Sequence, residues 1–288
     1  MRIKSFAKIN LGLEVLRKRD NNYHDIRTLF QSIDLYDLLK IEKTSQGDLF
    51  LDGNDNTISW GEDNLIFKAA SLLKERFGVP WGARIRVEKR IPAGKGLGGG
   101  SSNAAMTLYA LNELWGIRLD NQKLLNLGRE LGADVPYFLE GGLCLGVERG
   151  DVIIPLNDVQ HFHCLLVLPE FSVLTSSIYQ RVDLSLTSSN KASKIIKFLG
   201  SRDFSLLENE LEETVFSLYP QIKEIKSILQ NVGSELSLVS GTGAAIFGLF
   251  FEKERAIKGL KKLKTNYSSL LVEPLSRERY WKSIKAGV

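Results

Sequence analysis

The sequence predicts an α+β protein with two domains, and three observations support this fold class. A chain of 288 residues is long enough for about two domains of ordinary size. In both halves, segments with strand-like alternation occur together with segments of helical spacing. Polar residues interrupt this pattern near Val159. We therefore expect one domain over residues 1–159 and a second over residues 160–288.

The first domain begins with extended segments and continues with helices. Alternating apolar residues predict strands over 2–16, 35–44 and 83–89, and a short strand over 48–52 before the turn Asp52-Gly53-Asn54. Helical spacing follows over 64–77, where Gly78 and Pro80 end the pattern, and again over 102–115 and 122–131. A pair of strands around 144–148 and 152–155 completes this domain.

The second domain has the element order β-α-β-β-α-β. A buried type of strand over 163–168 precedes helices that extend to Asn231. Strands over 236–240 and 244–251 then flank a tight Gly-Thr-Gly turn, and a basic helix leads to a last strand over 269–273. This order is typical of a ferredoxin-like α+β domain.

The composition indicates a soluble globular protein of the cytoplasm that does not enter a membrane. Hydrophobic residues make up 43% of the chain and charged residues 25%, which is the balance of an ordinary folded domain. No apolar run reaches the ~18–20 residues of a membrane span, and the N-terminus has no signal-peptide core. Cys144 and Cys164 lie in apolar runs, so we expect buried free thiols in a reducing compartment.

Positive charge gathers toward the C-terminus, although the formal net charge is only +4. Residues 252–288 contain 10 Lys or Arg and 4 Asp or Glu. Within this stretch Ala256, Ile257, Leu260 and Leu263 share one helical face, which leaves the lysines on the other face. A solvated amphipathic helix explains the charge, and aromatic residues are not interleaved with it, so we expect no nucleic-acid partner.

A glycine-rich loop before a helix is the strongest functional signal. Five of the seven residues from Gly94 to Gly100 are glycine, and Ser101 and Ser102 follow. Glycine lets the backbone take positive φ and approach a ligand closely. Because the loop leads into a helix N-terminus, where free N–H groups favour an anion, we interpret it as a phosphate site.

The glycine loop does not match three other known types of phosphate-binding loop. Gly94, Gly96 and Gly99 match the dinucleotide fingerprint, but no second hydrophobic strand ending in an acidic residue follows the helix. No Gly-Lys-Ser/Thr ends the glycines, as a P-loop requires. The protein-kinase loop lies between two strands, whereas this one precedes a helix.

Three motifs resemble those of the GHMP small-molecule kinases, the family of galactokinase and of homoserine, mevalonate and phosphomevalonate kinases. The glycine loop over 92–105 is similar to the family's phosphate loop, residues 7–11 (AKINL) to its first motif, and residues 240–244 (SGTGA) to its third. The resemblance implies an N-terminal domain like domain 2 of ribosomal protein S5 and a ferredoxin-like C-terminal domain. It also implies ATP and Mg²⁺ as cofactors and a monomer or weak dimer.

The resemblance further implies which residues hold the nucleotide. Ser101 and Ser102 are the expected contacts to Mg²⁺ through the phosphates, and the Lys95 cation would add to phosphate attraction. The ATP-binding residues that it implies are Pro92, Ala93, Gly94, Lys95, Gly96, Leu97, Gly98, Gly99, Gly100, Ser101 and Ser102.

Two further segments are similar to those of the family members that act on a cytidine-diphospho sugar alcohol. They are Asn21-Asn22-Tyr23-His24, where the family pattern has Asp-Gly before Tyr-His, and residues 131–138 (LGADVPYF). Both Asn-Asn and Asp-Gly suit a turn. The resemblance implies transfer of a phosphoryl group from ATP to the 2-hydroxyl of that alcohol, a step of the non-mevalonate route to isopentenyl diphosphate.

Lys8 and Asp134 are the expected catalytic residues. A carboxylate that accepts the proton of a hydroxyl nucleophile is worth ~10²–10⁴-fold in rate. Asp134 lies between Gly132 and Pro136, where a helix N-cap is the alternative role. Lys8 lies among apolar residues of a strand, where a solvent-facing lysine is the alternative. Asn10 shares a strand face with Lys8 and is an expected substrate contact.

The remaining expected substrate contacts are Tyr23, His24, Tyr179 and Thr242. Tyr23 offers a ring face on which a base stacks, worth ~1–3 kcal/mol. His24 offers polar groups to the base edge, and Tyr179 is a candidate to close the stack from the second domain. Taken without the resemblance, Tyr-His in a turn is typical of a surface hairpin. Thr242 lies in a glycine turn that we expect near the phosphates.

Some alternatives remain open from the sequence. His161 and His163 share a strand face as zinc ligands do, but no further ligand lies near them in the sequence, so we expect no zinc site. Homoserine or phosphomevalonate as substrate, a nucleotide sensor without turnover, and RNA binding through the basic tail are rival functions. Tyr23, His24 and Asp134 argue against homoserine or phosphomevalonate as the substrate. The intact catalytic residues argue against a nucleotide sensor without turnover.

Overall fold

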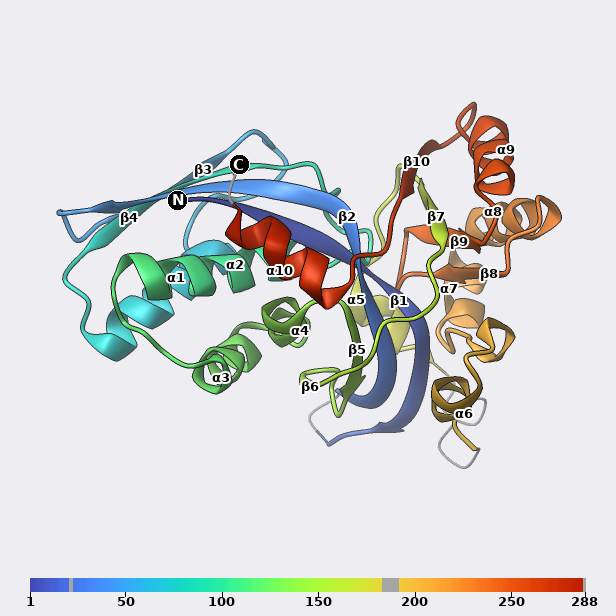
Figure 1. Ribbon diagram of the computed structural model, residues 1–288, viewed down its shortest axis with the longest axis horizontal. Helices are drawn as coiled ribbons and strands as arrows, with labels where there is room; N and C mark the ends of the chain where they lie inside the picture. The colour runs from blue at the N-terminus through green and yellow to red at the C-terminus, as the bar shows by residue number, and fades with distance from the viewer. Residues whose placement is uncertain (21–22, 183–191, 287–288) are drawn as a thin grey trace.

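The first sheet is built on a long antiparallel hairpin of β1 (Arg2–Lys18) and β2 (His24–Thr44). The computed structural model describes residues 1–20, 23–182 and 192–286 (Figure 1). The sequence pattern predicts the second strand only from residue 35, but β2 begins at His24 because its first half pairs with β1 and with β5. Register shifts interrupt the hairpin at Phe6/Ala7, Asn10/Gly12 and Val15/Arg17.

Four more strands join the hairpin and give this six-stranded sheet the order β3-β4-β2-β5-β6, with β1 paired to β2. Among these pairings β3–β4 is parallel and the others are antiparallel. The remaining strands are β3 (Leu49–Gly53), β4 (Gly82–Glu88), β5 (Leu143–Val147) and β6 (Val152–Pro155). Their bounds confirm the predicted strands to within a few residues.

Helices cover one face of the first sheet (Figure 1). Three of them match the predicted helices to within three residues at each end, and Gly78 ends the first in the left-handed region with φ 59°. A short fourth helix was not expected, although Pro136 occupies its first turn, a position that proline favours. These helices are α1 (Leu65–Phe77), α2 (Gly99–Leu114), α3 (Asn121–Leu131) and α4 (Val135–Glu140).

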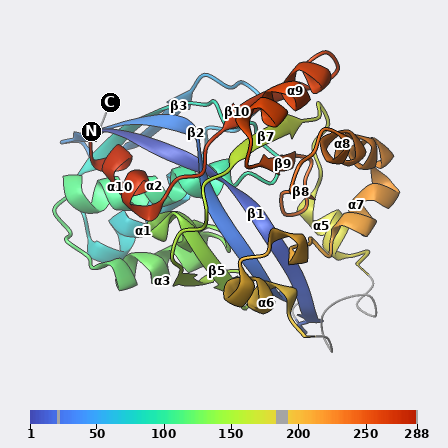
Figure 2. The same cartoon turned by 45° about the vertical axis from the view of Figure 1, so that its right-hand side comes forward.

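The second sheet has the order β10-β7-β9-β8 with every pairing antiparallel, which is the ferredoxin-like arrangement expected from the sequence. Helices α8 and α9 pack against it (Figure 2). The strands are β7 (His163–Leu168), β8 (Leu236–Val239), β9 (Ile246–Phe250) and β10 (Ser268–Val272). The helices are α5 (Thr175–Tyr179), α6 (Lys194–Ser201), α7 (Glu212–Leu218), α8 (Pro220–Asn231) and α9 (Lys253–Leu263), with a 3₁₀ turn over Phe204–Leu206.

A last helix, α10 (Arg277–Lys285), returns to the first sheet (Figure 1). Tyr280 is fully buried there and donates a hydrogen bond of 2.6 Å to the carbonyl of Phe138, and Trp281 donates one of 2.9 Å to the carbonyl of Glu140. The sequence pattern did not predict this helix. Its signal is Ser276, whose side chain caps the helix by accepting from the Arg279 N–H.

Buried apolar side chains from both halves meet between the two sheets. Ile9 and Leu29 of the first sheet share a core with Phe162 and Phe247 of the second half. On α9 the side chains of Ala256 and Leu263 are buried and the lysines are exposed, which confirms the predicted amphipathic helix. Among the described helices none is both long and apolar enough to cross a membrane.

Both cysteines are buried free thiols, as the sequence predicts. Burial raises the pKa of Cys144 to about 12, and burial also raises the pKa of Cys164. Because the thiolate is the reactive form, neither thiol is suited to nucleophilic chemistry at neutral pH.

Candidate active site

The glycine loop leads into α2 as expected, and three of its glycines have positive φ. Gly94, Gly96 and Gly98 have φ of 68°, 74° and 71°. Gly98 is the N-cap of α2, and no side chain of the described residues caps the helix, which leaves the N–H groups of its first turn available to an anion. The backbone of the loop therefore has the form of a phosphate cradle.

The turn over 240–245 holds this loop from the second half of the chain. Ser240 donates a hydrogen bond of 2.9 Å to the Gly96 carbonyl, and the Ala245 N–H donates one of 3.1 Å to the Lys95 carbonyl. A Cβ at Gly96 would lie 2.1 Å from the Ser240 carbonyl oxygen, so only glycine fits there. The second and third sequence motifs thus form one structural unit.

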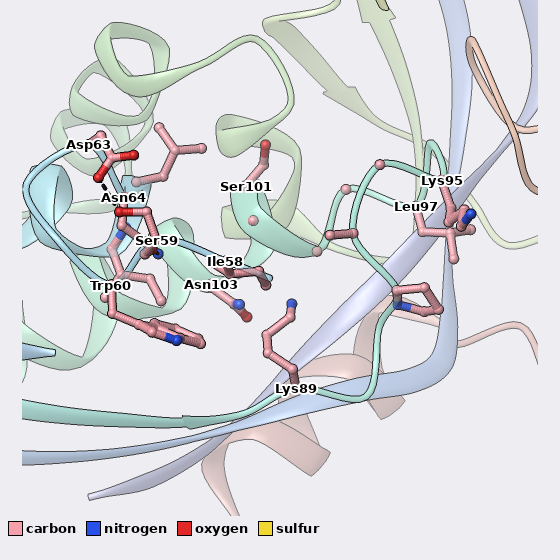
Figure 3. Close-up of a pocket in the computed structure, with 18 of the residues that line it drawn as sticks. Ile58, Ser59, Trp60, Asp63, Asn64, Lys89, Lys95, Leu97, Ser101 and Asn103 are labelled. Atoms are coloured by element: carbon pink, nitrogen blue, oxygen red, sulfur yellow. Dashed lines mark hydrogen bonds between the residues drawn. The ribbon is translucent and has the colours of Figure 1, made fainter. Parts of the chain in front are cut away.

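A cavity of about 390 Å³ lies against the outer side of the loop (Figure 3). In Figure 3 Lys89 reaches toward the cavity from below, with Trp60 and Ile58 on one side of it and the loop on the other. Asn103 also lines this cavity, and its buried side-chain oxygen has no hydrogen-bond partner among the described residues. Sequence reasoning missed Ile58, Trp60 and Lys89 because nothing in the pattern links them to the loop. Asn103 lies within the loop motif over 92–105, but it was not among the expected contacts.

Asp37 fixes the chain that enters the loop. Its fully buried carboxylate forms an ion pair with Lys89 and accepts hydrogen bonds of 2.7 and 2.8 Å from the N–H groups of Arg90 and Ile91. A buried charge pair of this kind depends on both partners, because either charge alone would be desolvated without compensation. Asp37 therefore fixes both the backbone just before the glycine loop and the side chain of Lys89, which lines the cavity.

Ser102 and Lys95 do not lie where the phosphate interpretation put them. The fully buried Ser102 is bonded through its hydroxyl to Ser5 at 2.7 Å, whereas Ser101 lines the cavity. The Lys95 ammonium donates to the carbonyls of Pro169, Glu170 and Phe171, and it points away from the cavity in Figure 3. Lys95 thus ties the loop to the second half of the chain and does not face an anion.

Lys8 and Asp134 come together in a second cavity of about 670 Å³. Lys8 Nζ lies 3.5 Å from Asp134 Oδ2, with the lysine side chain 4% exposed and the aspartate 34% exposed. Lys8 also donates a hydrogen bond of 2.6 Å to Asn10 Oδ1, and Asn10 donates one of 2.8 Å to Thr28. The alternative of a solvent-facing lysine is therefore wrong. Asp134 is the N-cap of α4, but its side chain makes no capping hydrogen bond.

Tyr23, His24, Tyr179 and Thr242 line the same cavity. His24 stacks on Tyr179 with ring centroids 5.2 Å apart, and its buried Nδ1 has no hydrogen-bond partner among the described residues. Tyr23 is 54% exposed and lies under the guanidinium of Arg149, 5.3 Å from the ring centroid. Asn21 and Asn22, which precede Tyr23 in the motif, lie outside the described residues.

Burial and the charge of Lys18 lower the pKa of His24 below its ordinary value of 6.5. Its ring is therefore neutral at neutral pH and carries one donor and one acceptor nitrogen. Arg149 and Lys18 also line the cavity, and sequence reasoning did not single them out. Cations at this end favour an anionic ligand.

Gly96 lines both cavities, so they meet at the glycine loop. One cavity holds the free helix N-terminus and the other holds the Lys8–Asp134 pair. This arrangement allows a phosphate-bearing ligand and a second ligand with a hydroxyl to meet at the loop.

Comparison with known proteins agrees with this geometry. Two family models match, GHMP kinases N terminal domain over residues 64–142 and GHMP kinases C terminal over residues 192–269. A 4-diphosphocytidyl-2-C-methyl-D-erythritol kinase of Caldicellulosiruptor bescii is 38% identical, over 94% of this chain and 97% of that protein. One of Thermodesulfovibrio yellowstonii is 40% identical, over 94% of this chain and 98% of that protein.

Solved structures give the same result. A crystal structure of 4-(cytidine 5'-diphospho)-2C-methyl-D-erythritol kinase superposes with a TM-score of 0.81 at 34% identity, covering 95% of this chain and 99% of that one. A homoserine kinase from Cytophaga hutchinsonii, at 18% identity and a TM-score of 0.74 over 96% of this chain and 95% of that one, shares the fold. The chain therefore belongs to the GHMP kinase family and, within it, to the group of the 4-diphosphocytidyl-2-C-methyl-D-erythritol kinases.

Proposed function

We propose that this protein transfers a phosphoryl group from ATP to the 2-hydroxyl of 4-diphosphocytidyl-2-C-methyl-D-erythritol, in the non-mevalonate route to isopentenyl diphosphate. The observation that carries the proposal is that Gly96 lines both cavities, one beside the helix N-terminus and one around Lys8 and Asp134. Donor and acceptor bound in these cavities meet at the loop. The reaction takes place in the cytoplasm, with the chain acting as a monomer or weak dimer.

The smaller cavity is suited to ATP. The unpaired N–H groups at the start of α2 would hold the phosphates, and the apolar wall with Trp60 and Ile58 would face the nucleoside. The unpartnered buried oxygen of Asn103 supports a ligand with hydrogen-bond donors. Ser101 is the residue of this cavity that would contact Mg²⁺. When bound, Mg²⁺ supplies positive charge that neutralises the phosphates.

Asp134 and Lys8 supply the chemistry of the acceptor side. The carboxylate of Asp134 accepts the proton of the substrate hydroxyl as the hydroxyl oxygen forms a bond to the γ-phosphorus of ATP. The bond between this phosphorus and the oxygen of the β-phosphate breaks, and ADP is the leaving group. Lys8, 3.5 Å away, fixes the position of the carboxylate and stabilises negative charge on the transferring oxygens. Asn10 holds the Lys8 ammonium in place through its hydrogen bond of 2.6 Å.

The far end of the larger cavity is suited to cytidine. Tyr23, which is 54% exposed, would stack on the base, and His24 would offer its polar groups to the base edge. Tyr179 supports His24 from the second half of the chain by stacking on it. Thr242 would contact substrate from the turn that follows β8.

We propose that the chain consists of two domains, residues 1–159 and residues 160–288. The chain crosses from the first sheet to the second between β6 and β7, which supports a boundary near Val159. Helix α10 is the exception, since it belongs by its packing with the first sheet.

A coupled assay of ATP consumption tests the function. With purified protein and Mg²⁺ we expect turnover with the cytidine-diphospho substrate and none above background with homoserine or phosphomevalonate. Mass spectrometry of the product should find one added phosphoryl group on the alcohol. Equal turnover of homoserine, or ATP hydrolysis independent of any alcohol, would overturn the proposal.

A further inference from the structure

His161, His163 and Glu273 lie together outside the active site. His163 Nδ1 is 2.9 Å from Glu273 Oε1, and His161 Nε2 is 3.0 Å from Glu273 Oε2. The three potential ligand atoms all lie within 4.8 Å of one another. The sequence predicts no zinc site at the two histidines because no further ligand lies near them, but folding brings Glu273 to them from 110 residues away.

The fold explains why these residues meet. β7 and β10 are antiparallel neighbours with Cys164 opposite Val272, so the next pair along places His163 opposite Glu273. His161 precedes His163 by two residues, and the two rings lie 5.1 Å apart. Residues 156–162 lead from the first sheet to the second, and residues 273–276 lead back to α10. The cluster therefore links the segment that leads from the first sheet to the second with the segment that leads back to α10.

The two oxygens of the Glu273 carboxylate differ in their partners. Oε1 forms a hydrogen bond of 2.9 Å with His163 Nδ1. Glu273 Oε2 lies 3.0 Å from His161 Nε2, yet this buried oxygen has no hydrogen-bond partner among the described residues. The nitrogen and oxygen are thus close without being aligned with each other, as two ligands of one ion are. Zinc bonds of ~2.0–2.1 Å in a tetrahedron place neighbouring ligand atoms ~3.3 Å apart. Each histidine nitrogen lies slightly closer than this to one oxygen of Glu273, and the three ligand atoms lie within 4.8 Å of one another.

Hydrogen bonds to the first sheet hold Glu273 in place. Its backbone N–H donates to Asp34 Oδ1 at 2.8 Å, and its carbonyl accepts from the Asp34 N–H at 3.0 Å. Such support around a ligand reduces the freedom that it loses on binding a metal. It also connects the cluster to β2, the central strand of the first sheet.

We propose that His161, His163 and Glu273 bind one divalent transition-metal ion, with zinc as the best match, and that the ion clamps the two connections between the sheets. Two imidazole nitrogens and a carboxylate oxygen form a donor set that zinc prefers, and Mg²⁺ prefers oxygen ligands. His161 is the most exposed ligand, so the ion enters from solvent and water completes its coordination. This site is separate from the proposed Mg²⁺ contact at Ser101.

Zinc titration of the untagged chain tests the site. The protein is treated with EDTA, desalted and titrated with ZnCl₂ by calorimetry, without nucleotide or Mg²⁺. We expect one zinc per chain and a melting temperature that rises with zinc concentration, because an ion that binds only the folded state stabilises it. His161→Gln and Glu273→Gln should each weaken zinc binding by at least ~10-fold and remove the thermal shift.

The third histidine of the chain provides a matched control. His24→Gln should bind zinc as the unchanged protein does, since His24 belongs to the active-site cavity. Circular dichroism establishes that each variant is folded, and the exposed His161 makes His161→Gln the safer of the two ligand variants. Failure of the unchanged chain to bind zinc at micromolar concentrations would overturn the proposal. So would equal affinity in folded His161→Gln, or loss of binding in His24→Gln.

Discussion

The buried ammonium of Lys8 lies 3.5 Å from the carboxylate of Asp134, although the two residues are on different elements of the fold. Lys8 is on β1 and Asp134 precedes α4. Asn10 accepts a hydrogen bond from the same ammonium, so the cation has two partners and a fixed position.

Asp134→Asn should lower kcat by ~10²-fold or more and leave the affinity for ATP nearly unchanged. The amide keeps the size of the side chain but does not accept a proton. Steady-state kinetics with the cytidine substrate and calorimetry with ATP measure the two quantities. Turnover close to that of the unchanged enzyme would remove Asp134 from the mechanism.

Combining Asp134→Asn with Lys8→Met should cost much less than the product of the two single effects. The two groups act as one unit, and such effects are strongly non-additive. The kcat of the double variant measures this coupling. Independent, multiplying losses would mean that Lys8 and Asp134 act on different steps.

Gly100→Val should raise the KM for ATP by ~10-fold or more while the protein stays folded. Among the residues that the structure describes, a Cβ at Gly100 would have only the Leu65 side chain within reach, at 4.0 Å, so it projects into the cavity that we assign to ATP. The position is helical, and valine is a better helix residue than glycine. Initial-rate kinetics over a range of ATP concentrations measure the change.

Gly200→Val is the matched control for this variant. Gly200 is also helical, on α6, and a Cβ there would meet no atom of the described residues within 4 Å. Its KM for ATP should not change. Gly98 is unsuitable for this test, since a Cβ there would lie 2.6 Å from the Phe138 ring and disturb the fold.

Tyr23→Ala should lower kcat/KM for the cytidine substrate by ~5- to 150-fold, mainly through KM. Stacking is equally strong in the ground state and the transition state, so kcat is little affected. CMP should compete with substrate in the unchanged enzyme and much less in the variant. A weakened affinity for ATP with an unchanged KM for the alcohol would reverse our assignment of the two cavities.

Phe50→Ala controls for the loss of an exposed aromatic ring. Phe50 is 46% exposed and has the Arg84 guanidinium 5.5 Å from its ring centroid, much as Tyr23 has Arg149. It lies on β3 and lines neither cavity. Its kinetic constants should equal those of the unchanged enzyme.

His24 should make the folded protein less stable in acid. Burial and Lys18 lower its pKa, so below pH 6.5 the unfolded chain takes up a proton more readily than the folded one. The contribution of neutral His24 to the free energy of unfolding is present above pH 6.5. It declines as the pH falls through the lowered pKa that His24 has in the folded protein. Urea unfolding of the unchanged protein and of His24→Asn at about pH 7.5 and about pH 5.5 measures it. We expect the difference in stability between them to shrink in acid, and a constant difference would contradict this.

The sequence predicted most elements of the fold because their periodicity and end signals are local. Asn64 and Asp120 cap α1 and α3, and Gly78 ends α1 in the left-handed region. The first half of β2 was missed because nearly every residue from His24 to Ile33 is buried, which hides the alternation of a strand. Helix α10 was missed because its only apolar signal is Tyr280, Trp281 and Ile284 within a basic segment.

The site was predictable where its residues lie in motifs and unpredictable where folding alone unites them. Lys8, Asn10, Tyr23, His24 and Asp134 are all found on the larger cavity. Trp60 and Lys89 have no local signal of function, since only packing brings them to the glycine loop. For the same reason, the sequence could not tell that Lys95 would turn away to three carbonyls of the second half.

The position of α10 has a consequence for how this protein folds during synthesis. Tyr280 is buried in the core of the first sheet, and a Cβ at Gly141 would lie only 2.3 Å from its ring. The helix α10 is therefore closely packed against the first half of the chain. The ribosome makes the whole second sheet before it reaches this helix. The apolar surface that α10 covers in the first half is therefore exposed, and accessible to chaperones, until the chain has been translated through residue 285.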